Sequence, residues 1–222
     1  MRPSLLDLMQ PPAGAASERE GRFLGVVVGI VTNNEDPEKL GRVKLRFPWL
    51  SDEDESFWAR VATPMSGPER GFFFLPEVED EVLVAFEHGD LRFPFVVGCL
   101  WNGQDKPPES EPLDGDGKVA KRVIKSRAGH VVRFDDTEGE EKIEIIDKTE
   151  SNSIVFDAAS GTITIRAEGD VVIESTDGNV VLRGKGIEVE STDSDVSVKA
   201  TGSMSLESDS DLTIKGSTVN IN

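Results

Sequence analysis

The amino-acid sequence predicts an all-β protein in which a small closed barrel precedes a segment that three copies wind into a β-prism. Three observations support this fold class. Short apolar runs separated by turn residues fill residues 21–103. Residues 161–222 repeat a pattern of about eight residues. Neither region shows the period of an amphipathic helix, which is 3.6 residues.

The C-terminal repeat is built from eight pairs of the form apolar-x-apolar, which we call the octad pairs. Their starts lie 8, 9, 7, 9, 8, 8 and 7 residues apart. Gly, Asp, Ser, Thr and Asn, the residues that turn a chain, lie between them. The octad pairs are Ile163 and Ile165, Val171 and Ile173, Val180 and Leu182, Ile187 and Val189, Val196 and Val198, Met204 and Leu206, Leu212 and Ile214, and Val219 and Ile221.

Each octad is predicted to be a short strand with one apolar face. Both members of a pair point to the same side, because side chains alternate along a strand. The residue between them points away, and these middle residues are mostly polar: Thr164, Val172, Val181, Glu188, Ser197, Ser205, Thr213 and Asn220. Three chains wound about one axis would enclose the octad pairs as a trimer core and would give every strand neighbours on both sides.

A monomeric β-solenoid or a β-sandwich tail is the alternative for this segment. A solenoid would need about three octads per coil and would form fewer than three coils, whereas such stacks need at least three repeats. A calcium-binding repeat array fits less well still. Its repeat has nine residues with paired glycines, and no Gly-Gly occurs here.

Composition limits the classes of function. The formal net charge of −18 repels phosphate backbones and argues against nucleic-acid binding. Cys99 is the only cysteine and lies in the apolar run VVGCLW, which predicts a buried thiol and excludes a disulfide within one chain. No apolar run approaches the ~20 residues that span a bilayer, and the N-terminus lacks the signal-peptide plan.

Residues 1–20 are predicted to be a tail. Leu5, Leu6, Leu8 and Met9 could form the apolar side of a short helix before Pro11, and a docking peptide and a frayed terminus explain them equally well. Residues 21–103 are predicted to form six strands of a small barrel, of the size of an oligonucleotide/oligosaccharide-binding (OB) fold. The predicted strands are 23–32, 42–47, 58–62, 71–75, 81–86 and 93–100, with Asp52 to Glu55 in a loop.

Candidates for chemistry are few, and we predict no catalytic, cofactor or metal site. His88 lies in a polar loop. His130 lies near Ser126 and Asp135 in sequence, but neither the elbow nor the oxyanion donors of a triad are visible. The turn Asp114-Gly115-Asp116-Gly117 lacks the third acidic position and the closing Glu of a calcium loop. The adjacent residues Phe72, Phe73 and Phe74 are predicted to supply barrel core and a subunit contact.

Four strings resemble the spike family of contractile injection systems, which includes the VgrG tip proteins of type VI secretion and the baseplate spikes of phages. GRVKLRFPWL, FWARVATPMSGPERGFFFLPEVEDEVLVAFEHGD and PFVVGCLWNGQDKPP resemble its OB domain. SRAGHVVRFDDTEGEEKIEI resembles its junction motif, here Gly129, His130, Phe134, Asp135 and Asp136. The resemblance implies an OB barrel at 21–103, a linker at 104–126, a neck at 127–160 and a triple-stranded β-helix at 161–222, in a homotrimer.

The departures from the family carry further expectations. The large VgrG proteins have a hub portion before the OB domain and some phage spikes have a lysozyme domain after it, so this chain resembles the short form. We therefore expect a separate hub protein that binds the N-terminal tail. Some spikes end in a His-x-His apex that binds iron, but this chain ends in Ser217, Thr218, Val219, Asn220, Ile221 and Asn222. We expect these residues to bind a PAAR-type tip protein instead.

The resemblance implies a central spike that seats on a hub and pierces the target envelope mechanically, with transient membrane contact and no enzymatic activity. It would assemble in the cytoplasm and become part of a phage tail or an injection particle. Two other functions remain open at this stage, a trimeric receptor-binding fibre or adhesin and a nucleic-acid-binding OB protein. The sequence does not distinguish a phage tail from a secretion system or an extracellular particle.

Overall fold

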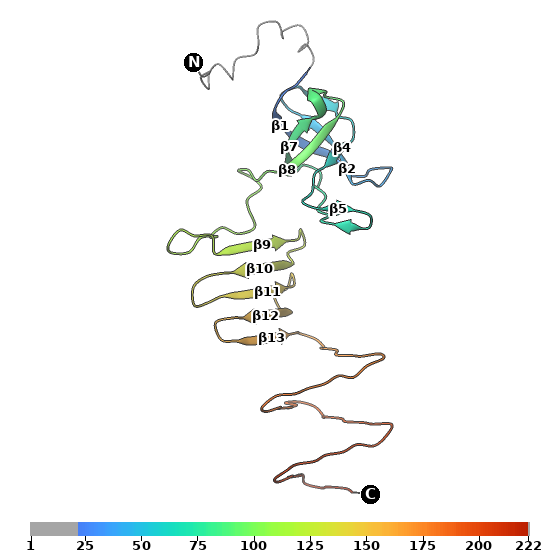
Figure 1. Ribbon diagram of the computed structural model, residues 1–222, viewed down its shortest axis with the longest axis vertical. Coiled ribbons are helices and arrows are strands. Elements are labelled where there is room, and N and C mark those ends of the chain that lie inside the picture. Colours follow the sequence, from blue (N-terminus) through green and yellow to red (C-terminus); the bar gives the residue numbers. More distant parts are fainter. Residues whose placement is uncertain (1–21, 222) are drawn as a thin grey trace, which may run out of the picture. The chain divides into compact units, whose positions relative to one another are not determined.

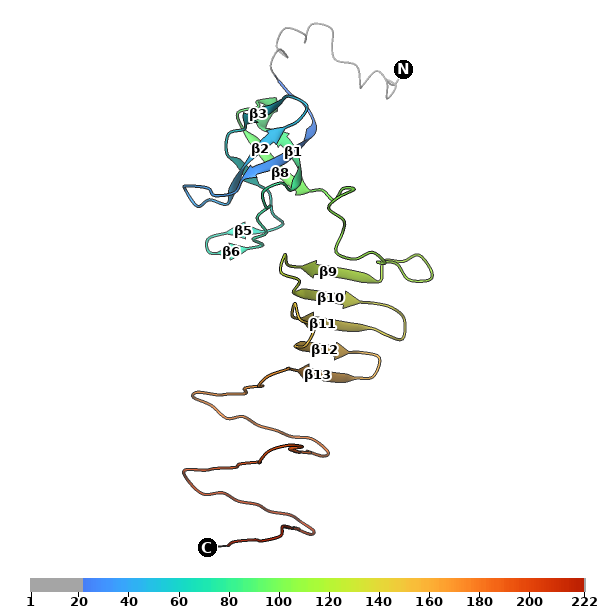
Figure 2. The same ribbon diagram turned by 180° about the vertical axis from the view of Figure 1, so that it is seen from behind.

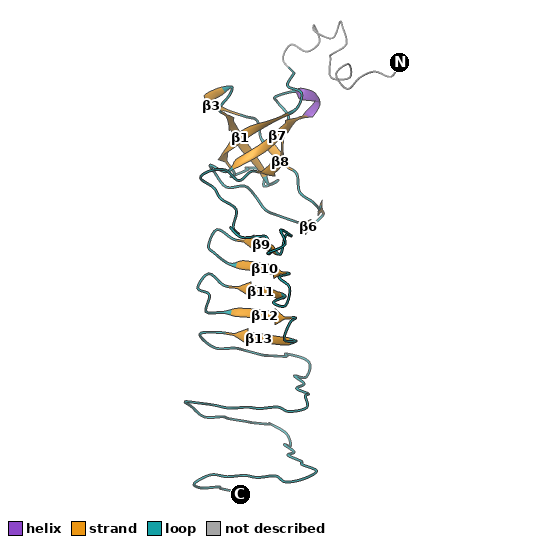
Figure 3. Ribbon diagram, turned by 90° about the vertical axis from the view of Figure 1, so that its left-hand side faces the viewer, coloured by secondary structure: helices purple, strands orange, loops and turns teal. Residues whose placement is uncertain are grey.

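The computed structural model describes residues 22–221, and in this range the protein is all-β, as predicted. No α-helix occurs among the described residues, and the one helical turn is the 3₁₀ turn η1 (Glu87–Gly89), purple in Figure 3. No helix of this range could cross a membrane. The strands are β1 (Val26–Asn33), β2 (Arg42–Phe47), β3 (Ser51–Glu55), β4 (Ala59–Val61), β5 (Ser66–Gly67), β6 (Arg70–Gly71), β7 (Glu81–Phe86), β8 (Pro94–Cys99), β9 (Lys121–Lys125), β10 (Val131–Asp135), β11 (Lys142–Ile146), β12 (Ser153–Asp157) and β13 (Thr162–Arg166).

Five strands close into a barrel. β1 pairs with both β2 and β7, β7 pairs with β8, and β4 joins β8 to β2, so the ring is complete. The β4–β8 pair is parallel, and the other pairs of the ring are antiparallel. Figure 1 shows these strands crossing one another at the blue-green end of the chain. A five-stranded closed barrel with this pairing is the OB type that the sequence predicts.

Alternation of apolar and polar residues determines which side chains enter the barrel. β2 (RVKLRF) and β7 (EVLVAF) bury every second residue, and their bounds are those predicted from the sequence. Phe47 and Phe86, which are 6% and 8% exposed, belong to the core. The rest of the core is formed by small aliphatic side chains with no exposed surface, because a narrow barrel has little interior volume. These are Val31, Val43, Leu45, Ala59, Val82, Val84 and Val96.

Three predictions about the barrel are wrong. Residues 51–55 form β3 and not a loop, because acidic Glu55 lies opposite basic β2 and its Oε2 lies 2.9 Å from Lys44 Nζ. Residues 71–75 form no continuous strand, and Phe72, Phe73 and Phe74 are 51%, 78% and 65% exposed, so none belongs to the core. Cys99 is exposed, because it is the last residue of β8 and follows the irregularity in the β7–β8 pairing.

The loop between β1 and β2 is held by one carboxylate. Asp36 accepts hydrogen bonds from Arg42 Nη2 at 2.7 Å and from Arg42 Nε at 2.9 Å. It also accepts bonds from the backbone N–H groups of Glu38 at 3.1 Å and Leu40 at 2.9 Å. The Asp36 side chain is only 3% exposed. The Arg42 guanidinium, together with these backbone donors, outweighs the effect of burial and holds the pKa of Asp36 well below its usual range.

The second sheet is an antiparallel meander in which each strand from β9 to β13 pairs with the next. Figure 2 shows these strands as successive rungs. β9 lies within the stretch expected to be a linker, and β13 contains the first octad pair, Ile163 and Ile165. The chain divides into two units between Glu168 and Gly169, and residues 169–221 contain no strand in the single chain.

The Asp36 loop makes a prediction about acid stability. Replacing Asp36→Asn removes the ion pair with Arg42, so the barrel should unfold at lower denaturant concentration than the parent at pH 7. Because folding lowers the pKa of Asp36, its stabilisation is complete above the unfolded pKa of about 3.9 and is lost as the pH falls through the lower folded pKa. Tryptophan fluorescence in denaturant at several pH values measures both effects.

The difference in stability between parent and Asp36→Asn should therefore shrink as the pH is lowered from 5 to 2. Asp116→Asn is the control, because the Asp116 side chain is 75% exposed and its ion pair with Lys118 is long at 3.6 Å. This control should match the parent throughout. A difference between parent and Asp36→Asn that stays constant over the pH range would contradict the assignment.

Candidate assembly interface

The β9–β13 meander has one face made almost wholly of hydrocarbon. Paired residues in adjacent strands share a face, and two rows cross all five strands. Arg122 is the only charged member of the rows. Many of the apolar members are largely exposed, such as Ile124 at 52%, Ile145 at 46% and Phe156 at 41%. We call this the apolar face: Ile124, Val132, Phe134, Ile143, Ile145, Ile154, Phe156, Ile163 and Ile165.

The opposite face of the same sheet holds charged residues, and two of these are buried. Glu144 and Asp135 are each 8% exposed. Arg133 Nη1 lies 3.1 Å from Glu144 Oε2, Lys142 Nζ lies 3.6 Å from Glu144 Oε1, and Glu109 reaches Arg133 Nε at 4.0 Å from the segment before β9. A single chain that buries its charges and leaves its hydrocarbon bare is the reverse of the usual arrangement. Residues 22–221 therefore provide no cover for much of the apolar face.

Local hydrogen bonds keep Asp135 ionised in this covered position. Burial alone would raise the pKa of its carboxyl. The Thr137 hydroxyl, at 2.6 Å, and the Thr137 backbone N–H, at 3.1 Å, donate to it, and Lys121 and Lys142 lie nearby. These contacts outweigh burial and lower the pKa of Asp135. Asp135 therefore has a structural role in the sheet.

The residues of the junction motif lie in β10 and the turns at its ends. Gly129 has φ of +102°, which favours glycine, and its N–H donates to the Ser126 carbonyl. His130 Nδ1 accepts a hydrogen bond from the Lys148 backbone N–H at 3.3 Å, and the His130 backbone N–H donates to Ser126 Oγ at 3.1 Å. Phe134 and Asp135 lie in β10, and Asp136 follows it and forms an ion pair with Arg122.

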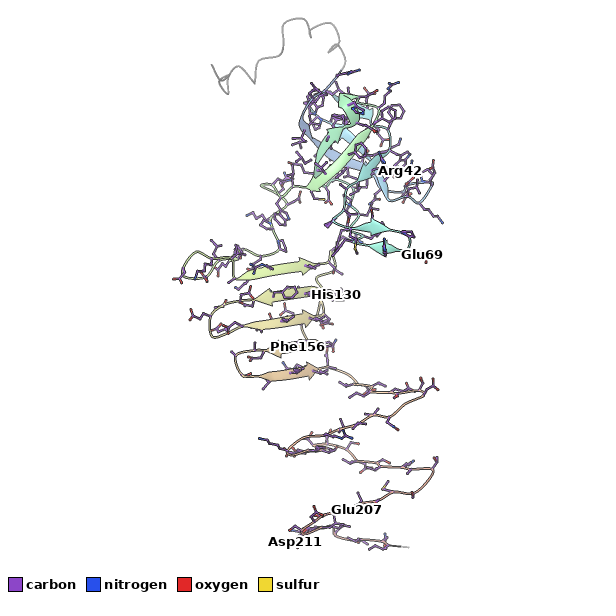
Figure 4. All side chains as sticks on the ribbon, in the orientation of Figure 1. Arg42, Glu69, His130, Phe156, Glu207 and Asp211 are labelled. Atoms are coloured by element: carbon purple, nitrogen blue, oxygen red, sulfur yellow. The ribbon has the colours of Figure 1, made fainter. Side chains whose placement is uncertain are left out.

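These contacts do not form a catalytic triad. Ser126 Oγ bonds to the backbone of His130 and not to its ring, and Asp135 bonds to Thr137. Figure 4 labels His130 and Phe156 on the ladder of strands. His130 lines a hollow on the sheet with Ile124, Val132 and Ile145. The motif thus joins β9 to β10 beside the apolar face.

The octad pairs are among the most exposed apolar residues of the described chain. Their exposed fractions run from 48% at Val219 to 87% at Ile221. Every residue from Gly169 to Ile221 is exposed. Figure 3 shows this segment in teal, as extended stretches that run back and forth without the side-by-side pairing of β9–β13. The side chains lack cover and the backbone lacks a ladder in one and the same segment.

The single chain thus differs from the predicted trimer core at every one of its positions. The sequence predicts that these sixteen side chains are buried, whereas one chain leaves all of them in solvent, because an extended segment without neighbours has nothing to pack against. Their burial by further copies stays a prediction. The exposed members are Ile163, Ile165, Val171, Ile173, Val180, Leu182, Ile187, Val189, Val196, Val198, Met204, Leu206, Leu212, Ile214, Val219 and Ile221.

Other predicted site residues lie apart from this interface or outside the described chain. The tail residues Leu5, Leu6, Leu8 and Met9 and the terminal Asn222 are not described. Ser217, Thr218, Val219, Asn220 and Ile221 are exposed. His88 lies in η1 with φ of +52°. The Asp114 carboxylate closes its own turn, since Oδ1 accepts hydrogen bonds from the backbone N–H groups of Asp116 and Lys118. Within residues 22–221 no group of three or more His, Cys, Asp or Glu could hold a metal ion.

The sequence analysis missed the apolar face on β9–β12. The signal was present as alternation, because RVI in β9, VVRF in β10, IEI in β11 and IVF in β12 each place apolar or long side chains two apart. These strands are separated by turns of irregular length, so no fixed period connects them to the octads. The structure shows that β13 contributes the first octad pair to the same sheet face.

Comparisons with known proteins agree with the barrel topology. Residues 27–101 match the family described as the type VI secretion system/phage-baseplate injector OB domain. The type VI secretion system spike protein VgrG5 of Pseudomonas aeruginosa is 33% identical over 55% of this chain and 17% of its own length. The spike protein VgrG3 of Vibrio cholerae is 30% identical over 58% of this chain and 13% of its own length.

A third relative is the actin cross-linking toxin VgrG1 of Vibrio cholerae, which is 30% identical over 56% of this chain and 12% of its own length. The chain thus spans a small part of the curated relatives that it matches. Their names share one feature, VgrG, and the matched OB domain contains the five-stranded barrel described above. Residues 27–101 thus form an OB domain of the type VI secretion and phage-baseplate injector type, and the chain is similar to VgrG spike proteins over about half of its length.

Proposed function

We propose that three copies of this chain form the central spike of a contractile injection apparatus. The observation that carries the proposal is the exposure of the octad pairs, none of which is less than 48% exposed in one chain. Burial of a Val, Leu, Ile or Met side chain stabilises a fold by about 1.5–3 kcal/mol. Sixteen such side chains left in water are not a stable arrangement, so the segment requires partners.

Further copies of the same chain fit this requirement better than an unrelated partner does. Every octad offers the same apolar-x-apolar surface, so a parallel copy displaced by one octad presents a matching surface. Backbone N–H and C=O groups of residues 169–221 would pair with those of the neighbouring copies. Three chains about one axis close the ladder on itself and leave no free strand edge along the shaft.

The apolar face of the meander also requires a partner that covers it, so the proposed contact extends from the octads towards the N-terminus. Ile163 and Ile165 belong both to the apolar face and to the octad pairs. Arg133 on the opposite face already pairs with Glu144 and Glu109 of the same chain, so we assign the apolar face to the other copies. The proposed trimer contact thus begins at β9 and continues to the C-terminus.

The proposed role is mechanical and not enzymatic. The barrel and the N-terminal tail, with Leu5, Leu6, Leu8 and Met9, would bind a separate hub protein. The wound octads would transmit the force of contraction to a narrow tip that contacts the target membrane transiently. A formal net charge of −18 per chain opposes binding to nucleic acid. The spike would assemble in the cytoplasm and act as part of a phage tail, a phage-tail-like particle or a type VI-like apparatus.

The first test places a charge in the proposed trimer core. Ile187→Asp would bring three carboxylates together in a site of low polarity, at a cost on the order of several kcal/mol per trimer. Light scattering should show loss or strong weakening of the trimer. The control Thr213→Asp adds the same carboxylate at an outward-facing position and should remain trimeric. A heat-resistant Ile187→Asp trimer would contradict the wound-octad arrangement.

The second test addresses the apolar face. Ile145 is 46% exposed in one chain, so Ile145→Lys should leave the folding of a lone chain unharmed. If other copies cover the face, the lysine is buried without a partner and association should weaken by several-fold or more in sedimentation equilibrium. Thr164→Lys on the opposite face is the matched control. Equal association of both variants would argue that the face stays in water.

The third test concerns the C-terminal end. We expect a PAAR-type tip protein to bind Ser217, Thr218, Val219, Asn220, Ile221 and Asn222. The full chain should pull down that tip protein. A variant without residues 217–222 should remain trimeric but should not pull it down. Lys215→Gln is the control, because it changes the charge just before residues 217–222 without removing them. This variant should still bind the tip protein. Unchanged binding after the deletion would count against this tip site.

A further inference from the structure

The residue that directly follows an octad pair alternates in charge along the chain over the first seven pairs. This position, which we call the post-pair position, follows the second member of its pair, so in an extended strand it points away from the apolar side. All of these residues are exposed. In chain order they are Arg166, Glu174, Arg183, Glu190, Lys199, Glu207 and Lys215, so the sign changes at every step.

The turns that follow strengthen the pattern. Asp177 follows Glu174, Lys185 follows Arg183, and two aspartates follow each of Glu190 and Glu207. Figure 4 labels one such acidic stretch at Glu207 and Asp211. The first turn is the exception, since acidic Glu168 and Asp170 follow Arg166. From Glu174 to Lys215, the sign of the charge alternates from one octad to the next.

Within the described part of the single chain, the post-pair charges do not form ion pairs with one another. No ion pair joins any post-pair side chain to another in the described residues 169–221. Successive post-pair positions are seven to nine residues apart along an extended chain, which is about 20 Å or more at about 3.3 Å per residue. An alternation with a period of two octads therefore needs a neighbour outside the chain to have an effect.

The next step rests on the proposed function. In a parallel three-chain ladder with one octad per rung, each octad lies between the next octad of one copy and the preceding octad of the other copy. Strands in such a ladder are about 4.8 Å apart, close enough for side chains at matching positions to interact. Each post-pair residue then has residues of opposite charge on both sides, because its neighbours are one octad away in sequence.

We propose that this charge alternation sets the register of the three copies, with two further copies of the same chain as the partners. The octad pairs cannot set it, since all of them present similar apolar surfaces and register is weakly specified in repetitive strands. If one copy slips by one octad, each of its post-pair residues lies beside residues of like charge. A slip of two octads restores the signs but leaves two rungs unpaired at an end.

Two cysteine reporters in a Cys99→Ser background distinguish the registers. Ser197 and Ser205 are middle residues of successive octads and are exposed in the single chain. In the proposed register, Ser197 of one copy lies beside Ser205 of the next, within the Cα separation of about 4.4–6.8 Å that a disulfide allows. The double variant Ser197→Cys/Ser205→Cys should oxidise to a covalent trimer. Ser197→Cys alone should give no crosslink in the proposed register. If one copy slips by one octad, position 197 of two copies lies side by side, and Ser197→Cys alone would give a crosslinked dimer.

Three charge variants are then compared with the parent in each reporter. Arg183→Glu/Lys199→Glu/Lys215→Glu makes the last six post-pair positions acidic. Arg183→Lys/Lys199→Arg/Lys215→Arg changes the same positions and retains their sign. The third variant adds Arg166→Glu, Glu174→Lys, Glu190→Lys and Glu207→Lys to the acidic triple, which restores the alternation with every sign reversed. Crosslinked species are measured on denaturing gels without reductant.

With Ser197→Cys alone, the acidic triple should give crosslinked dimers. With the double reporter, its yield of covalent trimer should be several-fold lower than that of the parent. The sign-retaining variant and the sign-reversed variant should behave as the parent does. Dimers in the sign-reversed variant at the level of the acidic triple would overturn the inference, and so would parent-like crosslinking of the acidic triple. Either outcome would refute the register inference alone, and the proposed function would still hold if the parent gives the covalent trimer. A parent that is not trimeric would instead refute the proposed function.

Discussion

The main constraint on this structure is that one chain cannot satisfy its own C-terminal segment. Residues 169–221 form no backbone ladder in the single chain, and their paired aliphatic side chains are about half exposed or more. Unpaired peptide groups and bare hydrocarbon are both unfavourable in a folded protein. Only neighbouring strands can correct the two defects together, because they bring hydrogen-bond partners and cover at once.

The barrel, the meander and the octads differ in how far the single chain pairs their backbone groups and buries their apolar side chains. The ring of β1, β7, β8, β4 and β2 closes on itself and buries its aliphatic and aromatic core. The meander is an intermediate case, since β9–β13 satisfy one another's backbones but leave the apolar face bare. The octads satisfy neither requirement alone. The groups that the single chain leaves unpaired or exposed thus increase from the barrel to residues 169–221.

Much of this organisation follows from local patterns in the sequence. The strict alternation of RVKLRF and EVLVAF fixes β2 and β7 to the residue, and the octad spacing identifies the segment whose apolar pairs the single chain leaves exposed. The failures have physical causes. β3 forms from acidic residues because β2 beside it is basic, and Phe72, Phe73 and Phe74 are apolar yet lie outside the closed ring. Both outcomes depend on tertiary neighbours, which local patterns do not record.

The central claim is that three chains are wound together from β9 to the C-terminus. Sedimentation equilibrium of the unmodified full-length chain, at several concentrations and at physiological salt, tests this most directly. The account requires a single species with three times the mass of one chain, stable on dilution. A monodisperse single subunit at the same concentrations would contradict it, because the octads would then have found cover within one chain.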